Sequence, residues 1–141
     1  ADESAFFALP EGQRGIFVGG GGSVRIARLM GVARMSDMML TGRVASPDEA
    51  ERWNLVQYVV PRGEALAKAH QLATAAASNA PLSNYAVINA LPRIQDMAKD
   101  DGLFVESFIS SFTAASPEAE ERLRAFLEKR AARLKAPDAT A

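Results

Sequence analysis

The most informative part of the chain is residues 5–31, which read AFFALPEGQRGIFVGGGGSVRIARLMG. An apolar run from Ala5 to Leu9 ends at Pro10, which is typical of a short buried strand, because proline cannot continue a hydrogen-bonded ladder. Four consecutive glycines follow at positions 19–22. The apolar residues of the segment Val24–Met30 then recur at near-helical spacing. This stretch predicts a strand, a glycine turn and a helix in succession.

The glycine run could bind an anion, because backbone N–H groups and a helix N-terminus would face it together. The phosphate-loop signature requires Gly-Lys-Ser/Thr, but Gly22 and not a lysine precedes Ser23. The dinucleotide fingerprint requires a glycine where Val24 stands. A tight turn in which backbone segments pack closely is the simpler interpretation. A nucleotide-binding loop is therefore the disfavoured alternative.

The rest of the first part of the chain contains further helix and strand signals. Met35–Leu40 predicts a second helix. Residues 46–49, Ser-Pro-Asp-Glu, predict the start of a short helix, with serine as N-cap and glutamate closing a capping box. Leu55–Val60 predicts a second strand, ended by Pro61. Because two strands make no stable sheet alone, residues 1–61 are expected to need strands from outside this chain.

From residue 62 onward the sequence predicts helices. An alanine- and leucine-rich segment, Glu64–Ser78, is followed by a helix that Pro81 opens and Pro92 interrupts. A last helix is expected from Ser116-Pro117 to Leu134. Acidic residues lead it and basic residues close it, which complements the helix dipole. The basic residues are Lys129, Arg130, Arg133 and Lys135. An aromatic stripe precedes the last helix and consists of Phe104, Phe108 and Phe112.

Composition excludes several classes of function. The chain has 141 residues, 48% of them hydrophobic, and a net charge of -1, which argues against nucleic acid or an anionic membrane as a main partner. It contains no cysteine and one histidine, His70, so thiolate or histidine-based metal sites are not expected. No apolar run approaches the roughly 20 residues that span a bilayer. The start lacks a basic-then-apolar leader, and we expect a cytoplasmic protein.

These motifs form an ordered series that resembles the crotonase (enoyl-CoA hydratase/isomerase) superfamily. The family pattern is an apolar run with Pro-Glu, a Gly-Ile-x-Pro-Gly-x-Gly-Gly turn and a helix ending in Arg-Leu-x-Gly. Phe7–Glu11, Gly15–Ser23 and Arg28–Gly31 follow it, and Val18 departs from it in place of proline. The likeness continues through Met39–Arg43, Ser46–Ala50, Leu55–Val56 and Val59–Pro61, and it ends with Phe126–Arg130.

The resemblance implies an α/β fold, namely the C-terminal half of a crotonase-type ββα spiral. Residues 1–61 would form the incomplete spiral core and residues 62–141 a helical oligomerisation region. In the family, the N-terminal half supplies the oxyanion hole, a second glutamate in hydratases and most of the pantetheine channel. A homotrimer or a dimer of trimers is the implied assembly.

Four site residues follow from the resemblance. Glu11 matches the family's acid/base glutamate at the acyl chain, and Gly19 matches a glycine whose N–H helps to hold the catalytic water. Phe126 and Lys129 match residues of the last helix that approach the adenine end of CoA. From their positions alone, Glu11 could be an exposed turn residue, Phe126 a core residue and Lys129 a solvated lysine. The CoA thioester is the substrate, and no cofactor or metal is expected.

The function implied is chemistry on an acyl-CoA thioester through an oxyanion-stabilised enolate, most simply hydration of a 2-enoyl-CoA in the intact protein. The alternative is an inactive truncated fragment or an assembly module that lacks the oxyanion hole. The residues that distinguish the family's hydratases, isomerases, dehalogenases and hydrolases lie N-terminal to Ala1, so the sequence leaves the reaction and the acyl chain open.

Overall fold

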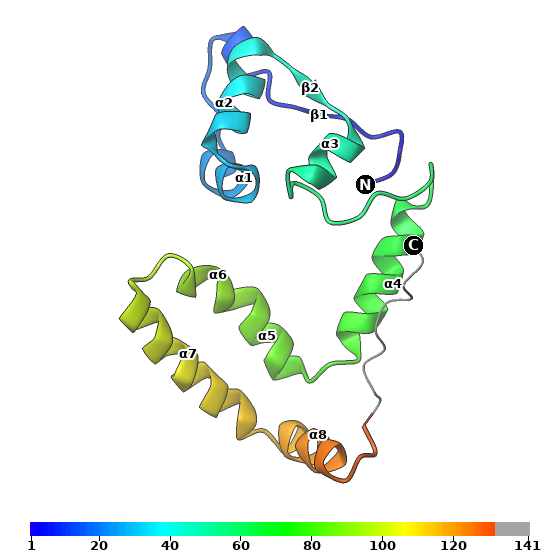
Figure 1. Cartoon of the computed structure of the whole chain (residues 1–141), viewed down its shortest axis with the longest axis vertical. Coiled ribbons are helices and arrows are strands. Elements are labelled where there is room, and N and C mark those ends of the chain that lie inside the picture. The colour runs from blue at the N-terminus through cyan, green and yellow to red at the C-terminus, as the bar shows by residue number, and fades with distance from the viewer. Residues whose placement is uncertain (132–141) are drawn as a thin grey trace. The chain divides into compact units, whose positions relative to one another are not determined.

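The computed structural model describes residues 1–131, and its contacts divide the chain into two compact units, Ala1–Leu72 and Ala73–Ala141. The first unit contains β1 (Phe7–Ala8), a 3-10 turn η1 (Gly12–Arg14), α1 (Gly22–Met30), α2 (Val32–Thr41), β2 (Val44–Ala45), α3 (Pro47–Arg52) and the start of α4 (Ala65–Ala77) (Figure 1). The second contains the end of α4, α5 (Pro81–Asn89), α6 (Leu91–Ile94), α7 (Lys99–Ala114) and α8 (Pro117–Leu127).

The core of the first unit is built from methionines. Met30, Met35 and Met38 are almost fully buried and pack with Leu9 and Ala45. Methionine is unbranched and adapts to irregular spaces between helices, and burial of each such side chain stabilises the fold by roughly 1.5–3 kcal/mol. This cluster joins the hairpin of α1 and α2 to the two short strands.

The strands are shorter than the sequence predicts. Only Phe7–Ala8 of the expected strand at residues 5–9 is paired, and it runs antiparallel to Val44–Ala45, which the sequence did not indicate as a strand. The predicted strand at residues 55–60 is wrong. Only Val60 forms a bridge there, to Asp2 in parallel orientation. A strand requires a neighbouring strand for its N–H and C=O groups. Within residues 1–131, a bridge partner is present for Val60 at the end of this segment and for none of its other residues.

The helices agree with the sequence more closely. The expected helices at residues 24–30, 35–40 and 64–78 correspond to α1, α2 and α4, and the break at Pro92 separates α5 from α6. The last helix differs: α8 ends at Leu127, Glu128 caps it, and Lys129 has a positive φ of 58°. Leu134, Arg133 and Lys135 lie outside the described residues. The boundary between the two units falls within α4, after Leu72, whereas the change in sequence character falls at residue 61.

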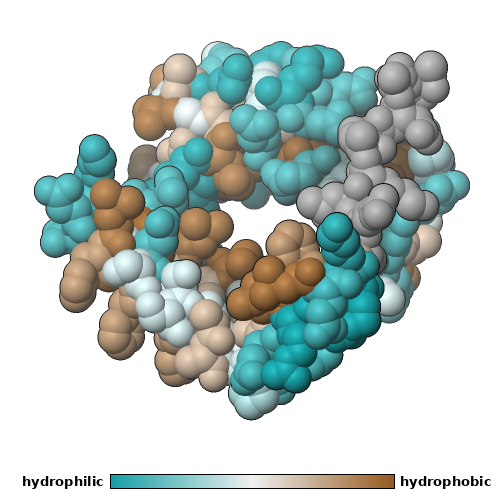
Figure 2. All heavy atoms as spheres, turned by 60° about the horizontal axis from the view of Figure 1, so that its bottom comes forward, coloured by the Kyte–Doolittle hydropathy of each residue, from teal (hydrophilic) through white to brown (hydrophobic). Residues whose placement is uncertain are grey.

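The second unit buries little apolar surface within residues 73–131, where only Ala80 and Gly102 are buried. The aromatic stripe of α7 is largely exposed, with Phe104 at 72% and Phe112 at 55%. Hydrophobic side chains reach the molecular surface in several places (Figure 2). The predicted apolar face of α4 also contains no buried residue. These helices therefore present apolar faces that their own unit does not cover.

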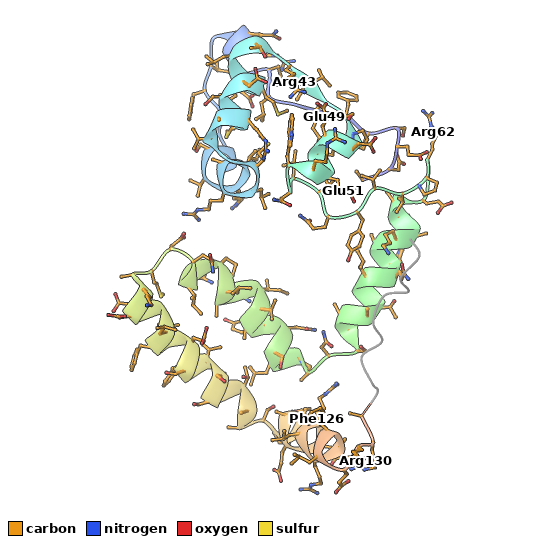
Figure 3. All side chains as sticks on the ribbon, viewed as in Figure 1. Arg43, Glu49, Glu51, Arg62, Phe126 and Arg130 are labelled. Carbon is orange, nitrogen blue, oxygen red and sulfur yellow. The ribbon has the colours of Figure 1, made fainter. Side chains whose placement is uncertain are left out.

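The predicted capping box at the start of α3 is confirmed. The hydroxyl of Ser46 accepts the N–H of Glu49 at 3.2 Å, and the carboxylate of Glu49 accepts the N–H of Ser46 at 3.1 Å. Arg43 also pairs with Glu49 (Figure 3). The N–H of Ser46 and, after it, the charge of Arg43 lower the pKa of the Glu49 carboxyl. These contacts hold the start of α3 next to β2.

Removal of the Ser46 hydroxyl should destabilise the first unit. Ser46→Ala leaves the N–H of Glu49 without its side-chain acceptor, and loss of such a cap costs about 1 kcal/mol. Urea unfolding would measure the change. Ser36→Ala is the control, because the Ser36 side chain makes no hydrogen bond within residues 1–131. Equal stability of the two variants would contradict this role of the capping box.

A second local contact ties the start of the chain to residues 60–63. The carboxylate of Asp2 accepts the hydroxyl of Ser4 at 2.6 Å and the N–H groups of Ser4 and Gly63 at 2.9 Å each. These bonds, led by the Ser4 hydroxyl, lower the pKa of Asp2 from 3.8 to about 2. Hydrogen bonds to the ionised form favour it, so the folded state binds the proton more weakly than the unfolded chain.

Asp2 should therefore give the first unit a stability that depends on acid pH. Because its pKa is lower in the folded state, the stabilisation is complete above 3.8 and is lost as the pH falls through about 2. Asp2→Asn should flatten the dependence of the urea midpoint on pH in this window. Glu3→Gln, at a neighbour with no side-chain hydrogen bond in residues 1–131, should leave it unchanged. An unaltered slope in Asp2→Asn would show that this carboxylate does not contribute.

Candidate functional site

Glu11 occupies the turn that follows β1. It precedes η1 with helical backbone angles of -59° and -42°, and its carbonyl accepts the N–H groups of Arg14 at 3.0 Å and Ile16 at 3.1 Å. The residue is half-buried. One carboxylate oxygen, Oε2, is fully buried and has no hydrogen-bond partner in the part of the chain that the structure describes. The alternative of an exposed turn residue is therefore wrong for this oxygen.

The position of Glu11 is set by contact between η1 and the C-terminal end of α2. A Cβ atom added at Gly12 would overlap the carbonyl oxygen of Met39 and lie 3.2 Å from its carbon. Only glycine allows two backbone segments to approach so closely. The side-chain amide of Gln13 also reaches the carbonyl of Thr41, at 3.5 Å. Because α2 is anchored by Met35 and Met38, the core holds this turn indirectly.

An unpaired buried carboxylate oxygen is unusual in a folded protein. Most buried polar atoms have a hydrogen-bond partner, and leaving one without a partner costs roughly 1–3 kcal/mol. Such atoms are explained by a bound water, ion or ligand, by local strain or by a catalytic role. A carboxylate on a fixed turn can accept a proton from a bound molecule and return it, which is the action of a general acid or base. The Oε2 atom of Glu11 is thus available to a hydrogen-bond donor from outside residues 1–131.

The glycine run forms a separate turn before α1. The N–H of Gly22 donates to the carbonyl of Gly19 at 3.0 Å, and Gly21 precedes the helix with a positive φ of 84°. Residues that carry a side chain rarely adopt that backbone conformation, which explains why glycine occupies this position. Gly19 is exposed, and its N–H has no acceptor within residues 1–131. No hydrogen bond of these residues joins Glu11 to the glycine turn, so the role of Gly19 stays a prediction.

Phe126 and Lys129 lie together at the end of α8, in the second unit. Phe126 is 67% exposed, so the alternative that it is a core residue is wrong within the described residues. Its position on the helix is visible in Figure 3. The N–H of Lys129 donates to the carbonyl of Phe126 at 3.0 Å. An exposed aromatic ring beside a lysine can bind a planar, anionic ligand, and this role stays a prediction.

The sequence did not indicate the contacts that Gly12 and Gln13 make with the end of α2. Glycine directly after Glu11 is the available signal, but it identifies no contact, because Met39 lies far along the chain.

No helix within residues 1–131 combines the length and apolar character that a bilayer crossing requires. In the same part of the chain, no three histidine, cysteine or acidic side chains gather closely enough to hold a metal ion.

Comparisons with known proteins place these features in context. The family described as enoyl-CoA hydratase/isomerase matches residues 1–137. The chain is 35% identical to enoyl-CoA hydratase EchA19 of Mycobacterium tuberculosis over 93% of its own length and 49% of that protein. It is 37% identical to 2,3-dehydroadipyl-CoA hydratase of Escherichia coli, over 92% of its length and 51% of that protein.

A solved structure of a related protein has a similar fold. The chain is 51% identical to a Rhodopseudomonas palustris protein that is provisionally described as an enoyl-CoA hydratase, with a TM-score of 0.86. The match covers 92% of this chain and 50% of that one. The chain therefore spans about half the length of the relatives that it matches.

Gly12→Ala should weaken the first unit by displacing the turn from α2. The new methyl group has no space beside the Met39 carbonyl, and overpacking of this kind costs roughly 1–3 kcal/mol. Urea unfolding would measure the loss. Gly19→Ala is the matched control, because a Cβ atom there meets nothing within 4 Å. Similar losses in both variants would show that the approach of Gly12 to Met39 is not what fixes the turn.

Proposed function

Because the chain belongs to the enoyl-CoA hydratase/isomerase family, we propose that it contributes the acid/base group Glu11 to an active site for acyl-CoA thioesters. The reaction proposed for the intact protein is hydration of a 2-enoyl-CoA. The observation that carries this proposal is the buried Oε2 of Glu11, which has no partner in residues 1–131. The names of two relatives, both hydratases of CoA esters, support the same reaction.

Hydration adds the oxygen of water to carbon 3 of the acyl chain and a proton to carbon 2. The electrons of the double bond move toward the thioester, whose oxygen carries negative charge in the enolate and then returns to a carbonyl. Glu11 is proposed to transfer a proton during this addition. The fixed turn confines its carboxylate to one region, which reduces the entropy lost in reaching the transition state.

The enolate oxygen requires hydrogen-bond donors, and each donor in such a site is worth about 3 kcal/mol. We assign the two donors to a part of the active site that this chain does not span, as the family resemblance implies. The chain would then be the C-terminal half of a ββα spiral, with Gly19 near the catalytic water. The half-length match to relatives is compatible with this arrangement.

The helical region from residue 62 is proposed to associate with other copies of the protein, as a trimer or a dimer of trimers in the cytoplasm. The exposed aromatic stripe of α7 supports this proposal, because large exposed apolar patches usually mark interaction surfaces. Phe126 and Lys129 are proposed to contact the adenine end of CoA. The second candidate is that the 141-residue chain alone is inactive and serves as an assembly module, which the exposed apolar side chains of its helices favour.

Glu11→Gln in the intact protein should abolish most of the turnover. Glutamine keeps the shape of the side chain but cannot transfer the proton, a step worth roughly 10²–10⁴ in rate. Hydration of crotonyl-CoA would measure kcat, and binding of the ester should survive. Glu51→Gln is the matched control, at an exposed glutamate of the same unit (Figure 3). A kcat of Glu11→Gln within about threefold of the unaltered protein would refute the proposed role.

The same assay separates the two candidates. The 141-residue chain alone should show no hydration, because the proposed donors to the enolate oxygen are missing. Turnover by this chain at the rate of an ordinary hydratase would contradict our assignment of those donors to another part of the protein.

A further inference from the structure

Helix α8 is attached to the second unit by few contacts. It contains no buried residue, and Leu123, Phe126 and Leu127 are each more than half exposed. Among residues 1–131, one side-chain hydrogen bond joins α8 to a distant segment: Arg122 Nη2 donates to the carbonyl of Ser78 at 2.8 Å, across 44 residues of sequence. The other charged bonds of this helix join neighbours, such as Arg124 with Glu120.

The acceptor lies at a place that favours a cation. Ser78 directly follows α4, whose last turn contains no basic residue. The carbonyl end of a helix carries a partial negative charge, which a nearby cation stabilises. The preceding carbonyls are already occupied: Ala75 accepts the Ser78 hydroxyl at 2.7 Å, and Ala76 accepts the Asn84 amide at 2.7 Å. Arg122 therefore supplies the charge that α4 lacks, at a turn that local bonds hold in shape.

The face of α8 that carries Arg122 also carries Phe126. Residues four apart lie on the same side of an α-helix, so Phe126 is one turn beyond Arg122. A bond from Arg122 to the fixed turn sets the rotation of α8 about its axis. It thereby sets the direction of Phe126 and of the capping residues that follow, because the N–H of Lys129 donates to the Phe126 carbonyl.

We propose that Arg122 is a positioning residue, which orients α8 so that Phe126 and Lys129 can receive the adenine-nucleotide end of a CoA ester. This inference rests on the proposed function for the ligand class, and it adds a residue that contacts no substrate itself. The proposal predicts different effects on the two parts of CoA. Loss of the bond should weaken recognition of the nucleotide part of CoA and leave recognition of the pantetheine part unchanged.

Calorimetric titration of the intact protein with CoA, and separately with pantetheine, tests the proposal. Arg122→Ala should raise the Kd for CoA by about tenfold, the effect of losing one hydrogen bond to a charged group. The Kd for pantetheine should stay the same. Arg122→Lys, which keeps a cation that can donate to the Ser78 carbonyl, should recover part of the CoA affinity. Arg124→Ala is the control, because within residues 1–131 the Arg124 side chain pairs only with Glu120 on its own helix.

The proposal is overturned if Arg122→Ala binds CoA as tightly as the unaltered protein. It is also overturned if the unaltered protein does not bind CoA. Equal weakening for CoA and pantetheine, or a matching loss in Arg124→Ala, also overturns it by showing a general structural effect. Hydration activity is measured in a separate assay. If the protein binds CoA in a way that depends on Arg122 but does not catalyse hydration, the proposed reaction fails and the role of Arg122 is still supported.

Discussion

The close approach of Gly12 to the carbonyl of Met39 links the turn that carries Glu11 to the core of the first unit. The backbone at position 12 lies so close to the Met39 carbonyl that no side chain fits there, so the turn lies directly against the end of α2. Helix α2 is in turn held by Met35 and Met38 against Leu9, the residue at the end of the strand segment that leads to Glu11. The turn is thus held from both of its ends.

This arrangement explains how a short sheet can support a site. The pairing of β1 with β2 covers two residues on each strand, which alone would be marginal in water. The methionine cluster provides most of the attachment, because each buried side chain contributes more than a single ladder hydrogen bond. The strands give the turn its direction, and the helices give it stability.

The two units contribute different properties to the proposed activity. The first holds a buried carboxylate oxygen on a fixed turn, which is suited to proton transfer. The second presents exposed aromatic and basic groups on α8, suited to a large, planar and charged ligand part. Its helices expose apolar faces within residues 73–131, where only Ala80 and Gly102 are buried.

The sequence by itself determined where several helices begin or break, because these signals are local, although it placed the end of α8 too late. Ser46 with Pro47 and Glu49 predicted α3, and Pro81, Pro92 and Pro117 predicted the starts and breaks of later helices. Its ordered motifs also indicated the family, and through that resemblance they predicted Glu11 as the acid/base residue. The tertiary structure alone decided that residues 55–60 are not a strand, that residues 44–45 are one, and that Glu11 is fixed by Gly12 against Met39. Strand pairing, close backbone approach and the burial of one carboxylate oxygen depend on residues distant in the chain, so no local pattern encodes them.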